Sequence, residues 1–138
     1  MRVGVLKPSL AAGTYGITTA IIDTGAHLSI VAEDLWRRFI PGFVTPLPFD
    51  ALTPPVLRAL TIAGGTFPYT LGELTIQLED YDHTILPITI VAKLTQDGGR
   101  LAVPLTLGLR GGFLEGRTLS AAPDATEPFA QAWVLQDP

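Results

Sequence analysis

The stretch TTAIIDTGAHLSIV, residues 18–31, decides the fold. Its apolar strand, residues 20–22, leads into one carboxylate, Asp23, and then into a turn built from Thr24 and Gly25. Because a carboxylate at the end of a buried strand is costly to ionise, it requires hydrogen bonds from nearby N–H and hydroxyl groups. Thr24 supplies a hydroxyl, and Gly25 lets the backbone approach closely, as a general acid–base site needs.

Short apolar runs rich in Val, Ile, Leu and Thr, punctuated by Gly or Pro, lie on both sides of this stretch and predict a mostly β chain. The alternation is clearest where Leu74, Ile76 and Leu78 share one face of a strand. The expected strands cover residues 2–6, 14–22, 56–62, 67–78, 84–93 and 101–105, with further strands at 117–121 and 130–135.

One segment, VAEDLWRRFI at residues 31–40, predicts a helix. Val31, Leu35 and Phe39 recur at helical spacing, with acidic residues early and arginines late, in agreement with the helix dipole. Pro41 and the glycine after it end the helix. A second short helix is expected after Gly108, so the chain predicts one or two short helices in all.

Composition narrows the class of protein. A length of 138 residues suits one domain, and the 47% share of hydrophobic residues supplies a core. The net charge of −4 and the absence of a Lys/Arg run exclude a nucleic-acid partner. With no cysteines, disulfides, thiolate catalysis and Cys-based metal sites are excluded. No signal peptide or membrane segment is recognisable, so a cytoplasmic location is expected.

The stretch around Asp23 resembles the catalytic loop of aspartic proteases, in which two apolar residues precede Asp-Thr-Gly and then Ala or Ser. With Ala26 it is similar to the retroviral-type, or retropepsin-like, branch, where one short chain supplies one lobe. A second family feature is an apolar pair followed by Gly near the C-terminus. Residues 105–115, LTLGLRGGFLE, carry Leu107-Gly108 in that place. Leu109 departs from the family pattern, because Arg commonly follows the Gly.

This resemblance implies an all-β, closed β-barrel-like acid protease lobe over residues 1–122 that works as a homodimer. Residues 123–138 form a C-terminal tail outside the resemblance. The family interleaves terminal strands at the dimer interface, so residues 1–6 are expected there, together with 117–121 or the tail that contains Trp133.

The resemblance also implies the chemistry. In a dimer the two Asp23 carboxylates meet about 3 Å apart and share one proton, as is established for aspartic proteases. One carboxylate acts as general base on a water that attacks the peptide carbonyl, while the other donates a proton to the developing oxyanion. Thr24 braces the pair, and Gly25 and Ala26 complete the active-site support. No cofactor or metal is required.

The substrate implied by the resemblance is an extended peptide or protein chain, bound beneath a hairpin that closes over it as a flap. The expected flap residues are Gly64, Gly65, Thr66 and Phe67. An alternative function stays open, in which the same fold is proteolytically inactive and serves as a peptide-binding or dimerisation module.

Other polar residues have simpler interpretations. His27 is expected to face solvent or to cap the helix, and Ser29 to bond at the start of the helix or within the loop. His83, with Asp80 and Asp82, suggests a metal site at first sight, but the spacing is that of a polar hairpin turn, so a solvated loop is expected.

Overall fold

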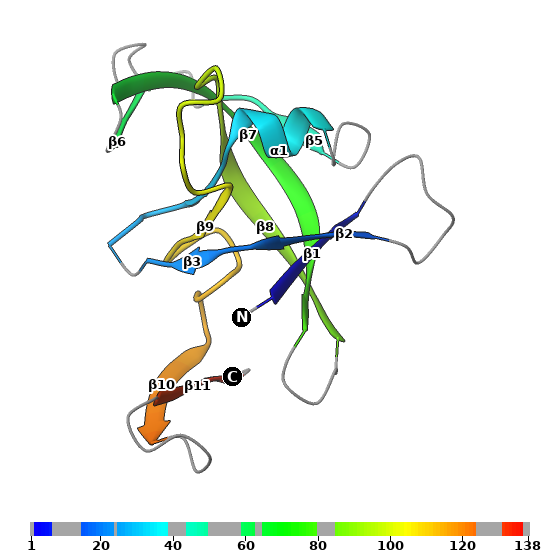
Figure 1. Cartoon of the computed structure of the whole chain (residues 1–138), viewed down its shortest axis with the longest axis vertical. Coiled ribbons are helices and arrows are strands. Elements are labelled where there is room, and N and C mark those ends of the chain that lie inside the picture. Colours follow the sequence, from blue (N-terminus) through cyan, green and yellow to red (C-terminus); the bar gives the residue numbers. More distant parts are fainter. Residues whose placement is uncertain are drawn as a thin grey trace.

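The structure is a computed structural model (Figure 1). It describes residues 2–6, 15–23, 25–38, 44–49, 59–62, 65–79, 85–123 and 131–136. These residues form a mostly β fold with one short helix. In chain order the elements are β1 (Arg2–Leu6), β2 (Tyr15–Thr19), β3 (Ile21–Ile22), β4 (Ser29–Val31), α1 (Glu33–Arg38), β5 (Thr45–Leu47), β6 (Ala59–Ile62), β7 (Gly65–Glu79), β8 (Ile85–Thr95), β9 (Leu105–Leu107), β10 (Thr118–Pro123) and β11 (Gln131–Gln136).

One mixed sheet holds most of these strands. Seven of them follow the order β2-β1-β7-β8-β4-β9-β3, and β5 and β6 pair with β7 off this path. β7 and β8 form a long antiparallel hairpin, the curved green ribbons of Figure 1. β4 pairs with β8 in parallel, and β3 pairs with β9 in parallel. The order β4-β9-β3 therefore places β9 between two strands that are close together in the chain.

The core lies against one face of the β7–β8 hairpin. The predicted alternation in β7 is confirmed, because Leu74, Ile76 and Leu78 are all buried. Their neighbours on β8 repeat the pattern, as a strand with one face on the core should. The buried cluster comprises Val31, Leu35, Leu74, Ile76, Leu78, Ile88, Ile90, Ala92, Leu94, Leu105, Leu107, Phe113 and Leu114.

The prediction of a closed barrel is wrong. The sheet is not closed, because β2 and β3, at the two ends of the strand order, do not pair with each other. They are consecutive in the chain and are separated only by Ala20. The single strand predicted at residues 14–22 is thus divided: its first part lies beside β1 and its last two residues lie beside β9. Two successive parts of one extended segment run end to end, so no ladder can form between them.

The predicted helix at residues 31–40 is observed as the shorter α1. Its first turn carries Glu33 and Asp34, and negative side chains there interact favourably with the helix dipole. Leu35 is buried in the core, and Trp36 is half-buried. Among the described residues no helix has the length and apolar character needed to cross a membrane.

The prediction of a second helix after Gly108 is wrong. Residues 109–117 form bends and a turn, and Gly111 and Gly112 have φ angles of 82° and 101°, whereas an α-helix needs about −63°. The reason is a close approach to β8. The backbone N–H of Val91 donates to the Gly111 carbonyl at 2.7 Å, and a Cβ on Gly112 would lie 2.4 Å from the carbonyl oxygen of Thr89.

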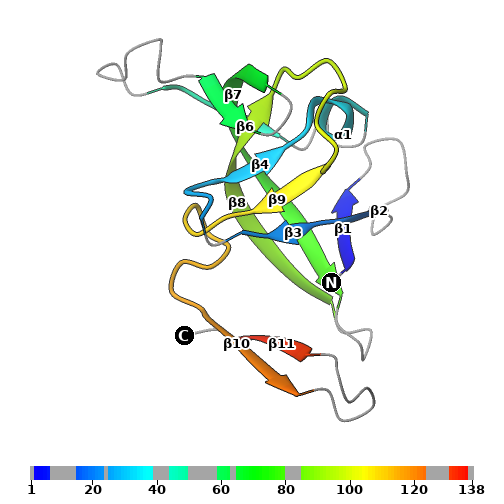
Figure 2. The same cartoon turned by 60° about the vertical axis from the view of Figure 1, so that its left-hand side comes forward.

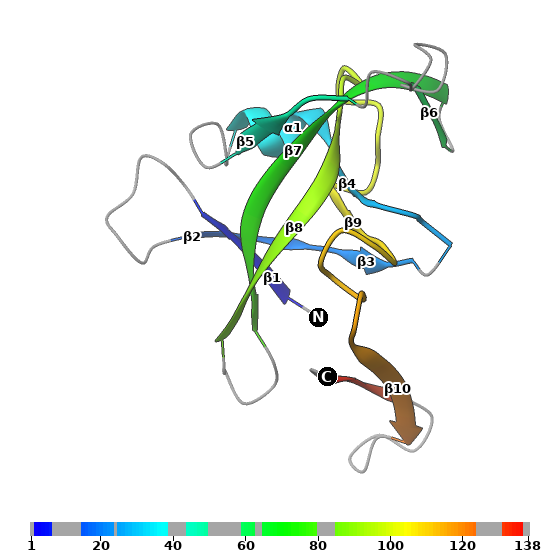
Figure 3. The same ribbon diagram turned by 180° about the vertical axis from the view of Figure 1, so that it is seen from behind.

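Strands near both ends of the chain pair with other strands of the same chain. β1 pairs with β2 along one edge and with β7 along the other. β10 and β11 form a separate antiparallel hairpin that extends away from the main sheet in all three views (Figures 1 to 3). The expected boundary between residues 1–122 and 123–138 falls inside β10.

Candidate functional site

Asp23 follows β3 and is held at the end of that strand by the backbone. Ile21 and Ile22 pair with Thr106 and Leu107 of β9, and the Asp23 N–H continues the ladder by donating to the Leu107 carbonyl at 3.0 Å. The Asp23 side chain is exposed. The apolar strand thus delivers one carboxylate to the surface from a backbone that is fixed on one side by β9.

The turn after Asp23 orients this carboxylate. The Gly25 N–H donates to Asp23 Oδ1 at 2.9 Å, and the Ala26 N–H donates to the Asp23 carbonyl at 3.1 Å. A Cβ on Gly25 would lie 3.1 Å from Oδ1, so the absence of a side chain permits this approach. Thr24 lies outside the described residues. Within the described part of the chain no hydrogen bond to the second oxygen, Oδ2, is found.

The second predicted motif lies directly against this turn. The Leu109 N–H donates to the Ala26 carbonyl and the Arg110 N–H donates to the His27 carbonyl, both at 2.8 Å. Gly108, which follows β9 directly, is buried. A Cβ at this position would lie 2.6 Å from both the carbonyl carbon and the carbonyl oxygen of Leu28. Only glycine fits this crossing without displacing backbone. The structure therefore brings Leu107 and Gly108 together with Asp23.

A buried hydroxyl completes the crossing. Ser29 is fully buried, and its Oγ accepts a hydrogen bond of 3.0 Å from the Gly108 N–H. Because an unpaired buried N–H is costly, this bond stabilises the place where the two motifs cross. It agrees with the loop-bonding role expected for Ser29.

Two apolar side chains near the Asp23 turn are exposed. Ile21 is 51% exposed and Leu109 is 45% exposed, although both belong to segments that fix the turn. His27, in the same turn, is exposed as well. A single chain therefore presents one carboxylate flanked by apolar surface, and no second acid of this chain bonds to it among the described residues.

The expected flap residues lie on the β6–β7 hairpin. Gly65 and Thr66 are exposed, and the Thr66 hydroxyl pairs with that of Thr61 across the hairpin at 3.0 Å. Phe67 is fully buried beneath the guanidinium of Arg100, so its ring does not face open space. Gly64 lies outside the described residues. In Figures 1 and 3 the hairpin and the chain between β3 and β4 lie on the same side of the molecule.

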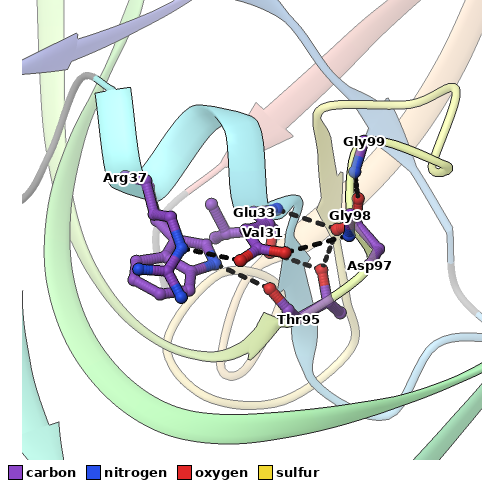
Figure 4. A network of polar contacts seen from close by, with 8 residues as sticks. Val31, Glu33, Arg37, Thr95, Asp97, Gly98 and Gly99 are labelled. Carbon is purple, nitrogen blue, oxygen red and sulfur yellow. Dashed lines mark hydrogen bonds and ion pairs between the residues drawn. The ribbon is translucent and has the colours of Figure 1, made fainter.

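A buried carboxylate that sequence reasoning missed lies at the start of α1 (Figure 4). Asp97 is 1% exposed, and its Oδ2 accepts from the Glu33 N–H at 2.8 Å and from the Thr95 hydroxyl at 2.6 Å. Its Oδ1 accepts from the Gly99 N–H at 2.8 Å. The Glu33 side chain in turn accepts from the Gly98 N–H at 2.9 Å. The available signal was Asp-Gly-Gly at residues 97–99, which marks a turn.

This cluster is structural in character. Burial raises the pKa of Asp97, but the hydrogen bonds from Glu33, Thr95 and Gly99 outweigh burial and hold the pKa below its ordinary value. The backbone bond from Gly98, followed by the bond from Arg37, likewise lowers the pKa of Glu33. Both oxygens of Asp97 are engaged, so this carboxylate is not available to activate a water.

No group of three or more His, Asp and Glu side chains that could hold a metal ion is found among the described residues. The candidate cluster at Asp80, Asp82 and His83 lies outside the described residues. Comparison with protein-family models, curated proteins and solved structures finds no match to this chain.

Proposed function

We propose that this protein is an aspartic endopeptidase that works as a homodimer, with one Asp23 from each chain at the centre of the active site. The observation that carries this proposal is the placement of Asp23. Its carboxylate is exposed, one oxygen is oriented by the Gly25 N–H, and the other is unbonded within the described residues. The crossing at Gly108 holds the turn from behind.

The reaction needs two such carboxylates facing each other. They hold one proton between them, because like charges about 3 Å apart cannot both ionise. The ionised Asp23 removes a proton from a bound water, which attacks the carbonyl carbon of the peptide bond. The protonated Asp23 donates to the carbonyl oxygen as negative charge develops there. The Asp23 that took the proton of water then donates it to the nitrogen as the C–N bond breaks, and the other Asp23 takes a proton back from a hydroxyl of the tetrahedral intermediate, so the pair again holds one proton.

Several features of the single chain support a dimer. One chain presents one acid, and the exposed Ile21 and Leu109 beside it form apolar surface that a second copy would bury. The β10–β11 hairpin has no ladder to the main sheet, so its outer edges are unpaired within the described residues. Unpaired strand edges invite pairing with another chain, and a symmetric contact satisfies both copies at once.

The substrate that fits this arrangement is an extended peptide. An extended segment bonds through its backbone to strand edges, while its alternate side chains enter apolar subsites. The β6–β7 hairpin, which Figure 1 shows on the same side of the molecule as the end of β3, supplies such edges.

A cleavage assay on a mixture of unfolded proteins, run between about pH 4 and pH 7, tests the proposal. Native protein is expected to cut, and Asp23→Asn to lose about 10² to 10⁴-fold in kcat, while remaining folded and dimeric. Asp34→Asn, the same change at an exposed aspartate of α1, is the matched control and keeps activity. If native protein cuts nothing, and both it and Asp23→Asn bind peptide equally, the peptide-binding module replaces the peptidase.

A further inference from the structure

The β6–β7 hairpin leaves the main sheet at a defined point. From Tyr69 to Glu79, β7 pairs with β8. Before Tyr69 it pairs only with β6, in the register from Ala59↔Pro68 to Ile62↔Gly65. One further backbone bond, from the Gln96 N–H to the Pro68 carbonyl at 2.9 Å, marks the last attachment to β8. Residues 65–67 and β6 therefore depend on side chains to fix their direction.

Phe67 lies immediately beyond that attachment and is fully buried, although it is not part of the main core cluster. The guanidinium carbon of Arg100 lies 4.6 Å from the centre of its ring, which is the geometry of a cation–π contact. Arg100 itself is exposed, so an exposed arginine covers a buried ring at the base of the hairpin.

Arg100 is held in turn by the 97–100 turn. Its Nε donates to the Asp97 carbonyl at 3.1 Å, and its backbone N–H donates to the same oxygen at 3.2 Å. The Asp97 side chain bonds the first residue of α1 and the Thr95 hydroxyl, as described above. The arginine therefore joins the β6–β7 hairpin to a turn that is itself hydrogen-bonded to the start of α1.

We propose that Arg100 is a positioning residue that fixes the β6–β7 hairpin by stacking on Phe67 from a turn anchored through Asp97. The anchoring stands on these contacts alone. Its consequence for peptide binding rests on the proposed function: a hairpin held in one direction presents its edge to a peptide without first having to be ordered, so loss of the clamp weakens binding more than it slows the chemical step.

Hydrogen exchange at the backbone amides of residues 59–67 tests the anchoring. A cation–π contact at a partly exposed site is small, so Arg100→Ala is expected to speed exchange in the hairpin about two- to five-fold. Arg100→Lys keeps the charge without the planar group and is expected to recover part of the protection. Arg110→Ala, which removes another exposed arginine side chain from a different segment, is the control and leaves hairpin exchange unchanged.

A second variant guards against a general loss of stability. Phe67→Leu keeps an apolar side chain but removes the ring, and its effect on hairpin exchange is expected not to add to that of Arg100→Ala, because both remove one contact. The proposed anchoring would be overturned if hairpin amides exchanged at the native rate in Arg100→Ala, or if the effects of the two substitutions were fully additive.

Kinetic measurements with a cleavable peptide test the role of Arg100 in peptide binding separately from the peptidase proposal. Arg100→Ala is expected to raise KM about two- to five-fold with kcat nearly unchanged. Native protein that cleaves peptides with no change of KM in Arg100→Ala would overturn the role in binding and leave the peptidase standing. Faster hairpin exchange in Arg100→Ala, in a protein that cleaves no peptide, would support the anchoring while the peptidase proposal fails.

Discussion

The buried hydroxyl of Ser29 accepts a hydrogen bond of 3.0 Å from the backbone N–H of Gly108, across 79 residues of chain. The bond lies where β9 passes between β3 and β4, directly behind the turn that presents Asp23. Two segments far apart in sequence are therefore locked together at the point that sets the direction of the carboxylate. The stability of this crossing and the placement of Asp23 should respond to the same substitutions.

Gly108→Ala should be among the most destabilising single-methyl additions in this chain. The added Cβ would lie 2.6 Å from backbone atoms of Leu28, and backbone cannot move aside as a flexible side chain can. We expect a loss of about 2 to 3 kcal/mol in the free energy of unfolding, measured by urea denaturation. At Gly99 an added Cβ meets nothing within 4 Å, so Gly99→Ala should cost only the left-handed backbone strain of about 1 kcal/mol. Equal losses would contradict the close approach at Gly108.

Ser29→Ala should destabilise the protein by about 1 to 3 kcal/mol, since it leaves the buried Gly108 N–H without an acceptor. The matched control is Thr89→Ala, which breaks an exposed hydroxyl pair with Thr75 of the same 3.0 Å length. That loss should be below about 1 kcal/mol, because water replaces the lost partner. Thermal and urea denaturation of both variants measure the contrast, and a smaller effect at Ser29 than at Thr89 would refute it.

Asp97→Asn should change how stability depends on pH. The folded-state pKa of Asp97 lies below its ordinary value, so the stability that its ionised form contributes is present above about pH 4 and is lost as the pH falls through the lowered folded-state pKa. Native protein should therefore lose stability in acid more steeply than Asp97→Asn, which has no proton to gain. At neutral pH the variant should be less stable by about 1 to 3 kcal/mol. Parallel pH profiles from urea denaturation would contradict this.

A chain that ends at Arg117 should fold but fail to dimerise. It lacks β10 and β11, which form no ladder with the main sheet, whereas the core cluster ends at Leu114. Sedimentation velocity is expected to find the full chain dimeric and the shortened chain monomeric at the same concentration, with the β-rich circular dichroism retained. A shortened chain that still dimerises would move the interface elsewhere.

Sequence patterns found the strongly periodic elements well. The alternation in β7 and the amphipathic pattern of α1 identify both elements, because their side chains face one core at the period of the element. The three-residue strands β4 and β5 were missed, since so short a strand has no readable period and is created by its partners β8 and β7.

The helix predicted after Gly108 is wrong for a different reason. Phe113 and Leu114 are buried as a helix would bury them, but the backbone between Gly111 and Gly112 packs on β8 instead, a long-range contact that local spacing does not encode. Asp97 was missed for the same reason, because its partner Glu33 lies 64 residues away. The prediction of a closed barrel was wrong because one continuous segment, residues 15–22, supplies the strands at both ends of the sheet.

The proposed active site requires two copies of Asp23 to face each other. The chain has no cysteine, so a single Asp23→Cys substitution at this exposed position gives a clean probe for a short bifunctional thiol reagent. Glu73→Cys, exposed on β7, is the control for chance collisions. Rapid covalent dimer formation by Asp23→Cys, and not by Glu73→Cys, is the predicted result. Cross-linking of Asp23→Cys no faster than that of Glu73→Cys would contradict the paired site.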